Sequence, residues 1–457
     1  MSVSYSVLAA VPAAARRSPS FARSGVIALA IRLGGAGSML LGHWVLARSL
    51  GVAGFGEYAQ AVAWLQVLCV FAKLGLDNAS LRYVSEYVTR NDDAKLCGFV
   101  RESSRAALIS SLIATAILAA IVLVAWNAIG SSLATSLLIA AVMIPLLSMR
   151  QVQEARLRGF GRLIQSQICV IVWPLSLFVL AGGVWVVSPG AMSSPLATFL
   201  HLLSIGVASL LVLSFLRRTP LRSNVHGASE SCTQQWTKTA AAFLFAELLI
   251  ALKSRICVAM AGITLGPDPA GLYAAMERLA DVSLLGAQSL GFVIAPQFAA
   301  LFAGGRFLEI RRLMWRGQLL GLAFTVPVAI VVAGLGDFVM LLLGPGFRDG
   351  YPVLIALLAS ACIAAFAGPG AYVLQMTGRE RSMMWITASC AVSNIVLSQL
   401  LMHRMGVLGL AIAQIVTSLI WTMGIQLTLR MHLASQSRTT LPSTASISDL
   451  GKVSSCE

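Results

Sequence analysis

Residues 242–262 read AFLFAELLIALKSRICVAMAG, a stretch that is long and apolar enough to cross a lipid bilayer. It nevertheless carries three charged side chains, Glu247, Lys253 and Arg255. Each charge at the centre of a bilayer costs about 2.5–3.5 kcal/mol even on a lenient insertion scale. These side chains must therefore pair, reach the membrane surface, or face a wet cavity between helices.

The composition of the whole chain indicates a polytopic membrane protein. Of its 457 residues, 58% are hydrophobic and only 11% are charged, whereas a soluble globular protein has about 25% charged residues. Apolar runs predict about twelve helical spans of roughly 20 residues each. We place them at 25–47, 57–77, 104–127, 134–150, 165–188, 195–216, 239–264, 272–300, 317–343, 353–376, 383–402 and 407–430.

The basic residues orient these spans. Of the 33 lysines and arginines, 25 lie in the segments on one side, and the loops on the other side hold only Arg48, Arg348 and Arg404. By the positive-inside rule both termini are cytoplasmic. The formal net charge of +15 is then a topology signal, so we expect contact with membrane lipids and no nucleic-acid partner.

Two similar segments predict two six-helix bundles. SLGVAGFGEYA (49–59) and TLGPDPAGLYA (264–274) align at an offset of 215 residues, and each opens a six-span block. An even number of spans per block relates the bundles by a pseudo-two-fold axis along the membrane normal. The glycines suit a tight turn, and we expect Tyr58 and Tyr273 at the membrane interface.

The predicted organisation has five parts. They are a flexible cytoplasmic leader (1–24), an N-terminal bundle (25–216), a cytoplasmic linker (217–238), a C-terminal bundle (239–432) and a disordered cytoplasmic tail (433–457).

Motifs for catalysis are missing from the sequence. There is no P-loop, no G-x-S-x-G, no H-E-x-x-H and no C-x-x-C. The eight cysteines show no metal-ligand spacing. We therefore expect a protein that is not an enzyme, with no cofactor and no metal site, and we seek its function within the spans.

Eight ionisable residues well inside the predicted spans are candidates for function. They are Arg32, Lys73, Glu247, Lys253, Arg255, Glu277, Arg278 and Asp281. One interpretation is structural: Arg278 pairs with Asp281, Arg32 pairs with Glu247 at the equivalent position of the other half, and Lys73 reaches the cytoplasm.

The competing interpretation is a central cavity with surplus positive charge. Arg32, Lys253, Arg255 and Arg278 would then bind an anionic head group, with Arg255 favoured because a guanidinium binds phosphate through two hydrogen bonds. Glu247, Glu277 and Asp281 would pair with these cations or couple transport to an ion. Pro174 and the run Gly368, Pro369 and Gly370 are candidate hinges for helix motion.

Four stretches of the chain resemble one family of membrane proteins. LARSLGVAGFGEYAQAVAWLQVLCVFAKLGLDNASLRYVSEY (46–87) resembles the opening hairpin of bacterial polysaccharide transporters, the O-antigen and exopolysaccharide flippases of the multidrug/oligosaccharidyl-lipid/polysaccharide superfamily. LLGPGFRDGYPVLIALLASA (342–361), LQMTGRERSMMW (374–385) and MGVLGLAIAQIVTSLIW (405–421) resemble later segments of the same family, and the likeness covers roughly residues 23–432.

This resemblance implies two bundles around a V-shaped cavity that carry an undecaprenyl-pyrophosphate-linked oligosaccharide by alternating access, for exopolysaccharide, capsule or lipopolysaccharide O-antigen. It also implies partners among polysaccharide polymerases and glycosyltransferases. It transfers no site residue, because charged cavity residues differ widely within the family. The alternatives are a cation-coupled drug or metabolite antiporter, a peptidoglycan-precursor flippase, which usually has two further helices, and a membrane glycosyltransferase or polymerase.

Overall fold

The computed structural model describes residues 19–188, 190–218, 233–377 and 379–439, without the side chains of 19–33, 432–439 and some interior positions, Lys253 among them. Within these ranges every regular element is a helix. The first half contains α1 (Pro19–Lys73), α2 (Leu76–Arg90), α3 (Asp93–Val124), α4 (Trp126–Ile129), α5 (Ser131–Gly159), α6 (Leu163–Val187) and α7 (Ser194–Arg217). The second contains α8 (Thr233–Thr264), α9 (Pro267–Ala303), α10 (Phe307–Gly334), α11 (Gly336–Leu343), η3 (Pro345–Gly350), α12 (Tyr351–Met376), α13 (Glu380–Met405) and α14 (Val407–Thr439).

The predicted spans correspond to these helices with few changes. Among the described residues, nine helices are long and apolar enough to cross a membrane. One of these nine covers the first two predicted spans, since α1 contains both with a break at Gly51. The helices α8 and α9 are not among the nine, although both exceed 30 residues; each has positions outside the described residues, and together they carry six of the eight charged residues singled out in the sequence. The fold is therefore an all-helical membrane fold with about twelve spans.

Several predicted boundaries differ from the structure. The second span ends at Lys73 instead of residue 77, because Leu74 and Gly75 adopt left-handed backbone angles and begin a turn into the amphipathic helix α2. The ninth span (317–343) is two helices, since α10 ends at Gly334 and α11 follows. The helices α1, α8 and α14 also extend into the segments predicted as leader, linker and tail.

Asp92 fixes the start of α3 at the loop after α2. Its side chain accepts a hydrogen bond from the backbone N–H of Lys95 at 3.1 Å and lies 2.9 Å from the Lys95 ammonium. These hydrogen bonds hold the pKa of the Asp92 carboxyl below its usual range. The cap explains why α3 begins eleven residues before the predicted apolar span.

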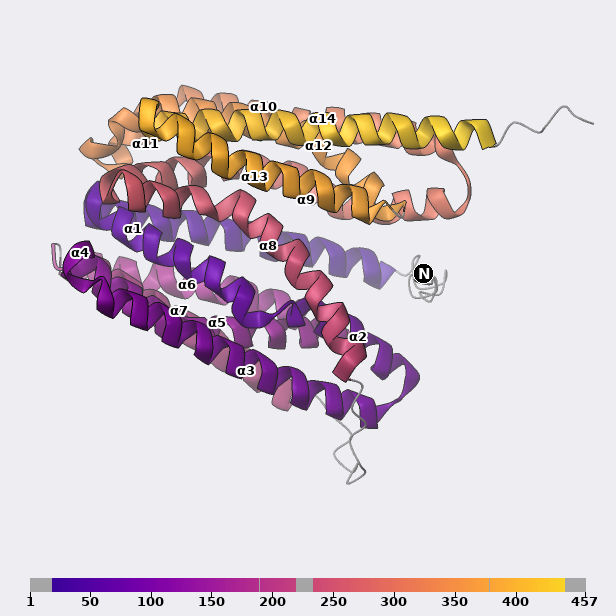
Figure 1. Ribbon diagram of the computed structural model, residues 1–457, viewed down its shortest axis with the longest axis horizontal. Helices are drawn as coiled ribbons and strands as arrows, with labels where there is room; N and C mark the ends of the chain where they lie inside the picture. The colour runs from indigo at the N-terminus through magenta and orange to yellow at the C-terminus, as the bar shows by residue number, and fades with distance from the viewer. Residues whose placement is uncertain (1–18, 189, 219–232, 378, 440–457) are drawn as a thin grey trace, which may run out of the picture.

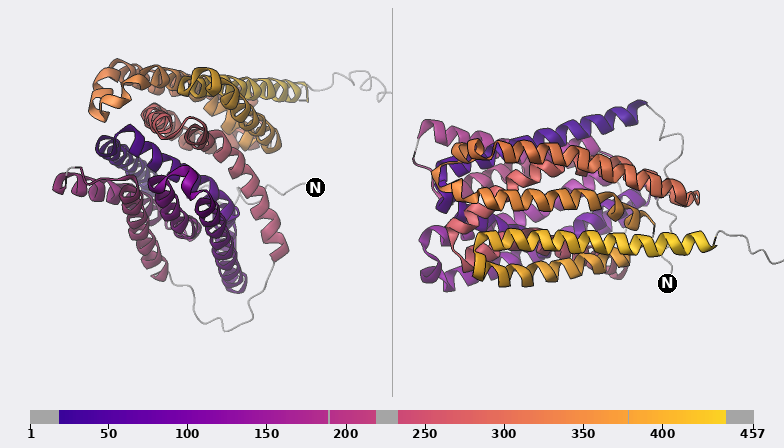
Figure 2. Two further views of the ribbon diagram at one scale, coloured as in Figure 1. Left: turned by 60° about the vertical axis from the view of Figure 1, so that its left-hand side comes forward. Right: turned by 90° about the horizontal axis from the view of Figure 1, so that it is seen from above.

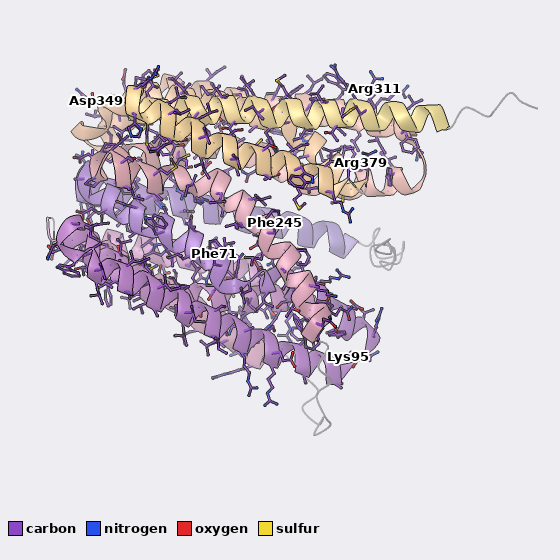
Figure 3. All side chains as sticks on the ribbon, viewed as in Figure 1. Phe71, Lys95, Phe245, Arg311, Asp349 and Arg379 are labelled. Carbon is purple, nitrogen blue, oxygen red and sulfur yellow. The ribbon has the colours of Figure 1, made fainter. Side chains whose placement is uncertain are left out.

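The helices form two layers that meet at one end of the molecule and separate toward the other (Figure 1). The first layer contains α1 to α7, and the second contains α9, α10, α12, α13 and α14, while α8 crosses between them (Figure 2). Lys95, Arg311 and Arg379 lie toward the end where the layers separate, and Asp349 lies at the opposite end (Figure 3). We call these the basic end and the closed end.

The halves repeat each other in backbone conformation. Gly51 has φ 68° and ψ −176°, and Gly266, 215 residues later, has φ 99° and ψ −178°. This conformation is essentially restricted to glycine. The equivalent turns confirm the internal repeat that the sequence offset predicts.

A second pair of equivalent glycines joins the halves at the closed end. A methyl group on Gly56 would overlap the carbonyl oxygen of Pro267, and one on Gly271 would overlap that of Val52. Tyr58 and Tyr273 lie in the core beside this contact and are each 1% exposed. The prediction that these tyrosines sit at the membrane interface is therefore wrong, because the close glycine contact buries them between the halves.

We expect Gly271→Ala to destabilise the protein by about 1–3 kcal/mol, the usual cost of overpacking a tight contact. The measurement is the midpoint of thermal unfolding in detergent. Gly183→Ala in α6 is the matched control, since a methyl group there meets no atom within 4 Å and alanine favours a helix. Equal midpoints for the two variants would contradict the close contact.

Candidate functional site

A cavity of about 1000 Å³ lies between α1 and the helices of the second half. Its lining comes from α1, α8, α9, α12, α13 and α14, and along α12 it extends from Leu357 to Gln375, toward the basic end. At its other end lies the buried core that joins the halves, with Phe55, Tyr58 and Tyr273. The cavity therefore ends blindly at the closed end and faces the end at which the layers separate (Figure 1).

Four charged side chains gather in this cavity. Arg255 comes from α8, and Glu277, Arg278 and Asp281 come from successive turns of α9. One Arg278 guanidinium nitrogen lies 3.5 Å from Asp281 Oδ2, which confirms the predicted pair, and the Asp281 side chain is half exposed. These four charges thus avoid lipid by facing a cavity.

The rest of the lining is suited to a ligand that is both apolar and polar. Small and apolar residues such as Ala361, Ala364 and Leu284 alternate with hydroxyl and amide side chains. The hydroxyl and amide residues are Ser360, Thr387, Ser418, Gln288, Gln375 and Gln414. Such neutral groups donate and accept hydrogen bonds, as a sugar requires.

The predicted cation set is only partly placed in the cavity. Arg255 and Arg278 line it, whereas the side chains of Arg32 and Lys253 lie outside the described residues. Among the side chains that are described, the cavity holds two arginines and two carboxylates. The predicted surplus of positive charge is therefore not seen in this part of the chain.

Two of the eight charges lie at a separate place. The Lys73 ammonium lies 2.6 Å from Asp77 Oδ2 and 2.7 Å from Glu247 Oε2, and Lys73 is only 8% exposed. The prediction that Lys73 extends to the cytoplasm is wrong, because two carboxylates hold it inside the protein. Glu247 has Lys73 as a partner, and the predicted pair of Glu247 with Arg32 stays a prediction because the Arg32 side chain lies outside the described residues.

His43 is a cavity residue that the sequence analysis missed. It lines the main cavity and also an adjoining space of about 20 Å³, which is bordered by Gln66, Arg255, Glu277 and Arg278. A space of this size holds about one water molecule. The sequence signal for His43 is its ionisable side chain within the predicted span 25–47.

The candidate hinges lie in continuous helices. Pro174 is buried within α6, and Gly368 lines the cavity within α12. A methyl group on Gly317 would lie 3.3 Å from the Pro369 ring, so the two residues are close neighbours. A methyl group on Gly370 would overlap Ile425 and Leu429 of α14. Their role as hinges stays a prediction.

In the described residues no group of three His, Cys, Asp or Glu side chains is placed to hold a metal ion.

The two charged clusters should differ in their contribution to stability. We expect Lys73→Met to cost about 3–5 kcal/mol, because it leaves the buried carboxylate of Asp77 and the partly buried carboxylate of Glu247 without their cation. Asp281→Asn should cost at most about 1 kcal/mol, because its half-exposed ion pair is screened by water. Thermal unfolding of both variants checks this, and a larger loss for Asp281→Asn would contradict the different environments.

Solved structures of similar fold are membrane transporters. An inward-facing multidrug resistance MATE family transporter of the MOP superfamily matches with a TM-score of 0.71 and 14% identity, over 91% of this chain and 99% of that one. An outward-facing MATE family transporter matches with a TM-score of 0.63 and 14% identity, over 91% and 95%. The lipid II flippase MurJ in an inward closed conformation matches with a TM-score of 0.68 and 13% identity, over 90% of each chain.

These likenesses show the fold, including its two pseudo-symmetric halves. A comparison with curated proteins gave no match. A sequence profile described as polysaccharide biosynthesis protein matches residues 22–302, which is more than half of the chain. The chain therefore belongs to the polysaccharide biosynthesis protein family.

Proposed function

We propose that this protein is a flippase for undecaprenyl-pyrophosphate-linked oligosaccharide. It moves the head group from the cytoplasmic to the periplasmic leaflet of a bacterial inner membrane, for the synthesis of exopolysaccharide, capsule or O-antigen. The observation that carries the proposal is the cavity at membrane depth that contains Arg255 and Arg278, in a member of the polysaccharide biosynthesis protein family.

The chemistry of the cavity supports this cargo. A sugar head group cannot cross hydrocarbon alone, because its hydroxyl groups would lose their hydrogen bonds. Serine, threonine and glutamine side chains on the cavity wall supply replacements. Arg255 and Arg278 are suited to the pyrophosphate, since guanidinium groups bind phosphate oxygens through paired hydrogen bonds. The prenyl chain stays in the lipid.

The two-layer arrangement supports alternating access. With the basic end in the cytoplasm, the described conformation faces inward, and its cavity is closed on the periplasmic side by the core around Gly56 and Gly271. Rocking of the bundles 25–216 and 239–432 that parts this contact and brings the layers together at the basic end would expose the cavity outward, while the linker 217–238, the leader and the tail stay cytoplasmic. Glycosyltransferases that build the cargo and a polymerase that extends it are the partners that this role requires.

A second candidate function is a cation-coupled drug or metabolite antiporter. Glu277 and Asp281 favour it, because they place negative charge in the same cavity and could attract a cationic cargo. In the flippase they would instead pair with the arginines or couple transport to an ion.

Deletion of the gene separates these functions. A flippase predicts loss of a surface polysaccharide, accumulation of its lipid-linked precursor in the cytoplasmic leaflet, and unchanged drug sensitivity. The measurements are polysaccharide staining and growth in a panel of cationic drugs. Increased drug sensitivity with normal polysaccharide would favour the antiporter.

We expect Arg255→Ala to reduce polysaccharide export by about ten- to a hundredfold, because charge-assisted hydrogen bonds are worth about 1.5–3 kcal/mol. Arg255→Lys should retain part of the activity, since a lysine keeps the charge but not the paired hydrogen bonds. Arg311→Ala is the control, because Arg311 is an exposed residue of α10. Normal export by Arg255→Ala at equal membrane abundance would end the proposed role of this arginine.

A further inference from the structure

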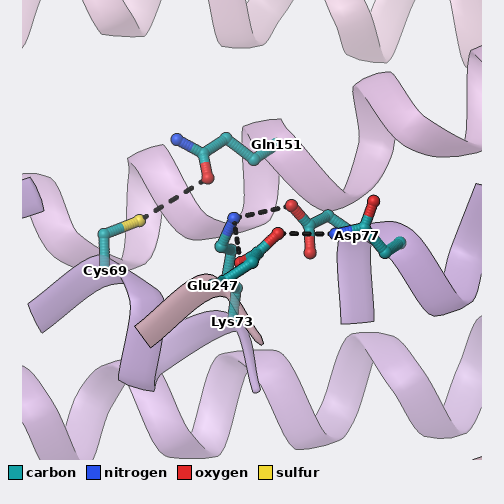
Figure 4. A network of polar contacts seen from close by, with 6 residues as sticks. Cys69, Lys73, Asp77, Gln151 and Glu247 are labelled. Atoms are coloured by element: carbon teal, nitrogen blue, oxygen red, sulfur yellow. Dashed lines mark hydrogen bonds and ion pairs between the residues drawn. The ribbon is translucent and has the colours of Figure 1, made fainter. Parts of the chain in front are cut away.

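A second polar cluster lies outside the cavity, where the break between α1 and α2 meets α8 (Figure 4). Lys73 ends α1, Asp77 lies in the first turn of α2, and Glu247 projects from the middle of α8. The Lys73 ammonium bridges the two carboxylates at 2.6 and 2.7 Å. Asn78 donates a hydrogen bond of 2.6 Å to Glu247 Oε1.

The charges of this cluster do not balance among the side chains that the structure describes. Two carboxylates share one ammonium, which leaves one negative charge in excess. Asp77 is 9% exposed, and its Oδ1 is buried with no hydrogen-bond partner. An uncompensated buried charge costs several kcal/mol, and a single bound cation would remove that cost.

The surrounding helices do not supply this cation from their described side chains. Cys69 of α1 and Gln151 of α5 lie beside the cluster and are joined by a contact of 3.9 Å (Figure 4). The next charged group that acts on this region is Arg150 of α5, and Arg150 is already paired with Glu154. The excess negative charge therefore stays on the carboxylates of Asp77 and Glu247.

The missing cation is a proton rather than a metal ion. The Lys73 ammonium lies within 2.7 Å of both carboxylates and would repel a second positive ion at that distance. Hard metal cations also take about six or more oxygen ligands, whereas only Asp77 Oδ1 and Glu247 Oε2 lack a hydrogen bond among the described oxygens of this cluster, and Glu247 Oε2 already lies 2.7 Å from the Lys73 ammonium. A proton needs a single carboxylate oxygen and leaves the Lys73 contacts in place.

The position of the cluster connects it with the cavity. Ala246, Leu249 and Ile250 of α8 line the cavity, while Glu247 on another face of the same helix contacts the first half. A methyl group on Gly75 would overlap the backbone of Ala240 in α8, so the helix lies directly on the α1–α2 turn. Trp236 at the start of α8 adds a hydrogen bond of 2.8 Å to Tyr87.

We propose that Asp77 and Glu247, with Lys73 between them, form a proton-binding site that holds the basic-end half of α8 against the first six-helix bundle. With the proton bound, the cluster is neutral and α8 stays attached as one wall of the inward-facing cavity. Loss of the proton leaves a buried negative charge between α8 and the bundle, which weakens the attachment. The link to transport rests on the proposed function, whereas proton binding does not.

The test is a pH titration of the purified full-length protein by infrared difference spectroscopy, which detects the C=O stretch of protonated carboxyl groups. We expect a titrating signal in the wild type that is missing in Glu247→Gln and in Asp77→Asn, because each variant leaves one neutral Lys–carboxylate pair. Glu86→Gln is the control, since Glu86 is also on α2 but pairs with Arg90. Sodium should not replace the proton.

Two further results decide the proposal without any glycan substrate. Hydrogen exchange of residues 239–250, corrected for its intrinsic pH dependence, should increase with pH in the wild type and be independent of pH in Glu247→Gln. Glu247→Gln should also unfold at a higher temperature than the wild type at alkaline pH, which a misfolded variant could not do. A carboxyl signal that persists in both variants, or a signal that sodium abolishes, would overturn the proton site and leave the flippase proposal intact.

Discussion

The cost of placing an ionised side chain in hydrocarbon is the constraint on which this structure depends. The helices α8 and α9 carry too many charges to face lipid on all sides, and they lie between the two halves. Their charged side chains avoid contact with lipid there in two ways. Arg255, Glu277, Arg278 and Asp281 line a cavity, and Glu247 joins Lys73 and Asp77 in a dry cluster. The same requirement thus accounts for a polar cavity and for a contact that ties one wall of that cavity to the opposite bundle.

The glycine contact at the closed end gives the molecule its asymmetry between the two membrane faces. Equivalent residues of the two halves, Gly56 and Gly271, meet where the pseudo-symmetry axis brings the halves together. Because neither residue has a side chain, the backbones approach closely there and bury Tyr58 and Tyr273. The layers can separate only toward the other end, which is where the cavity faces (Figure 1). Opening the closed end, as the proposed alternating access requires, would need this contact to part.

The sequence predicted the fold better than the site, for physical reasons. Apolar spacing, basic loops and the 215-residue repeat reveal the helices, and the equivalent turns at Gly51 and Gly266 confirm the repeat. The turn at Leu74 and Gly75 was missed because the apolar run continues through it. Arg278 and Asp281 could be paired because they lie on one helix face. Lys73 and Glu247 could not be paired, since 174 residues separate them and only the tertiary packing of α8 on the α1–α2 turn brings them together.

The central claim is that a glycan enters the chamber between the halves. Site-specific photocrosslinking in cells that accumulate the lipid-linked precursor tests this most directly. A photoreactive residue replaces either Met384, on the cavity wall, or Leu319, on the outward face of α10, where the Leu319 side chain is 60% exposed. The flippase account predicts a carbohydrate-bearing adduct at Met384 and none at Leu319. The absence of carbohydrate from the Met384 adduct, or equal labelling at both positions, would contradict it.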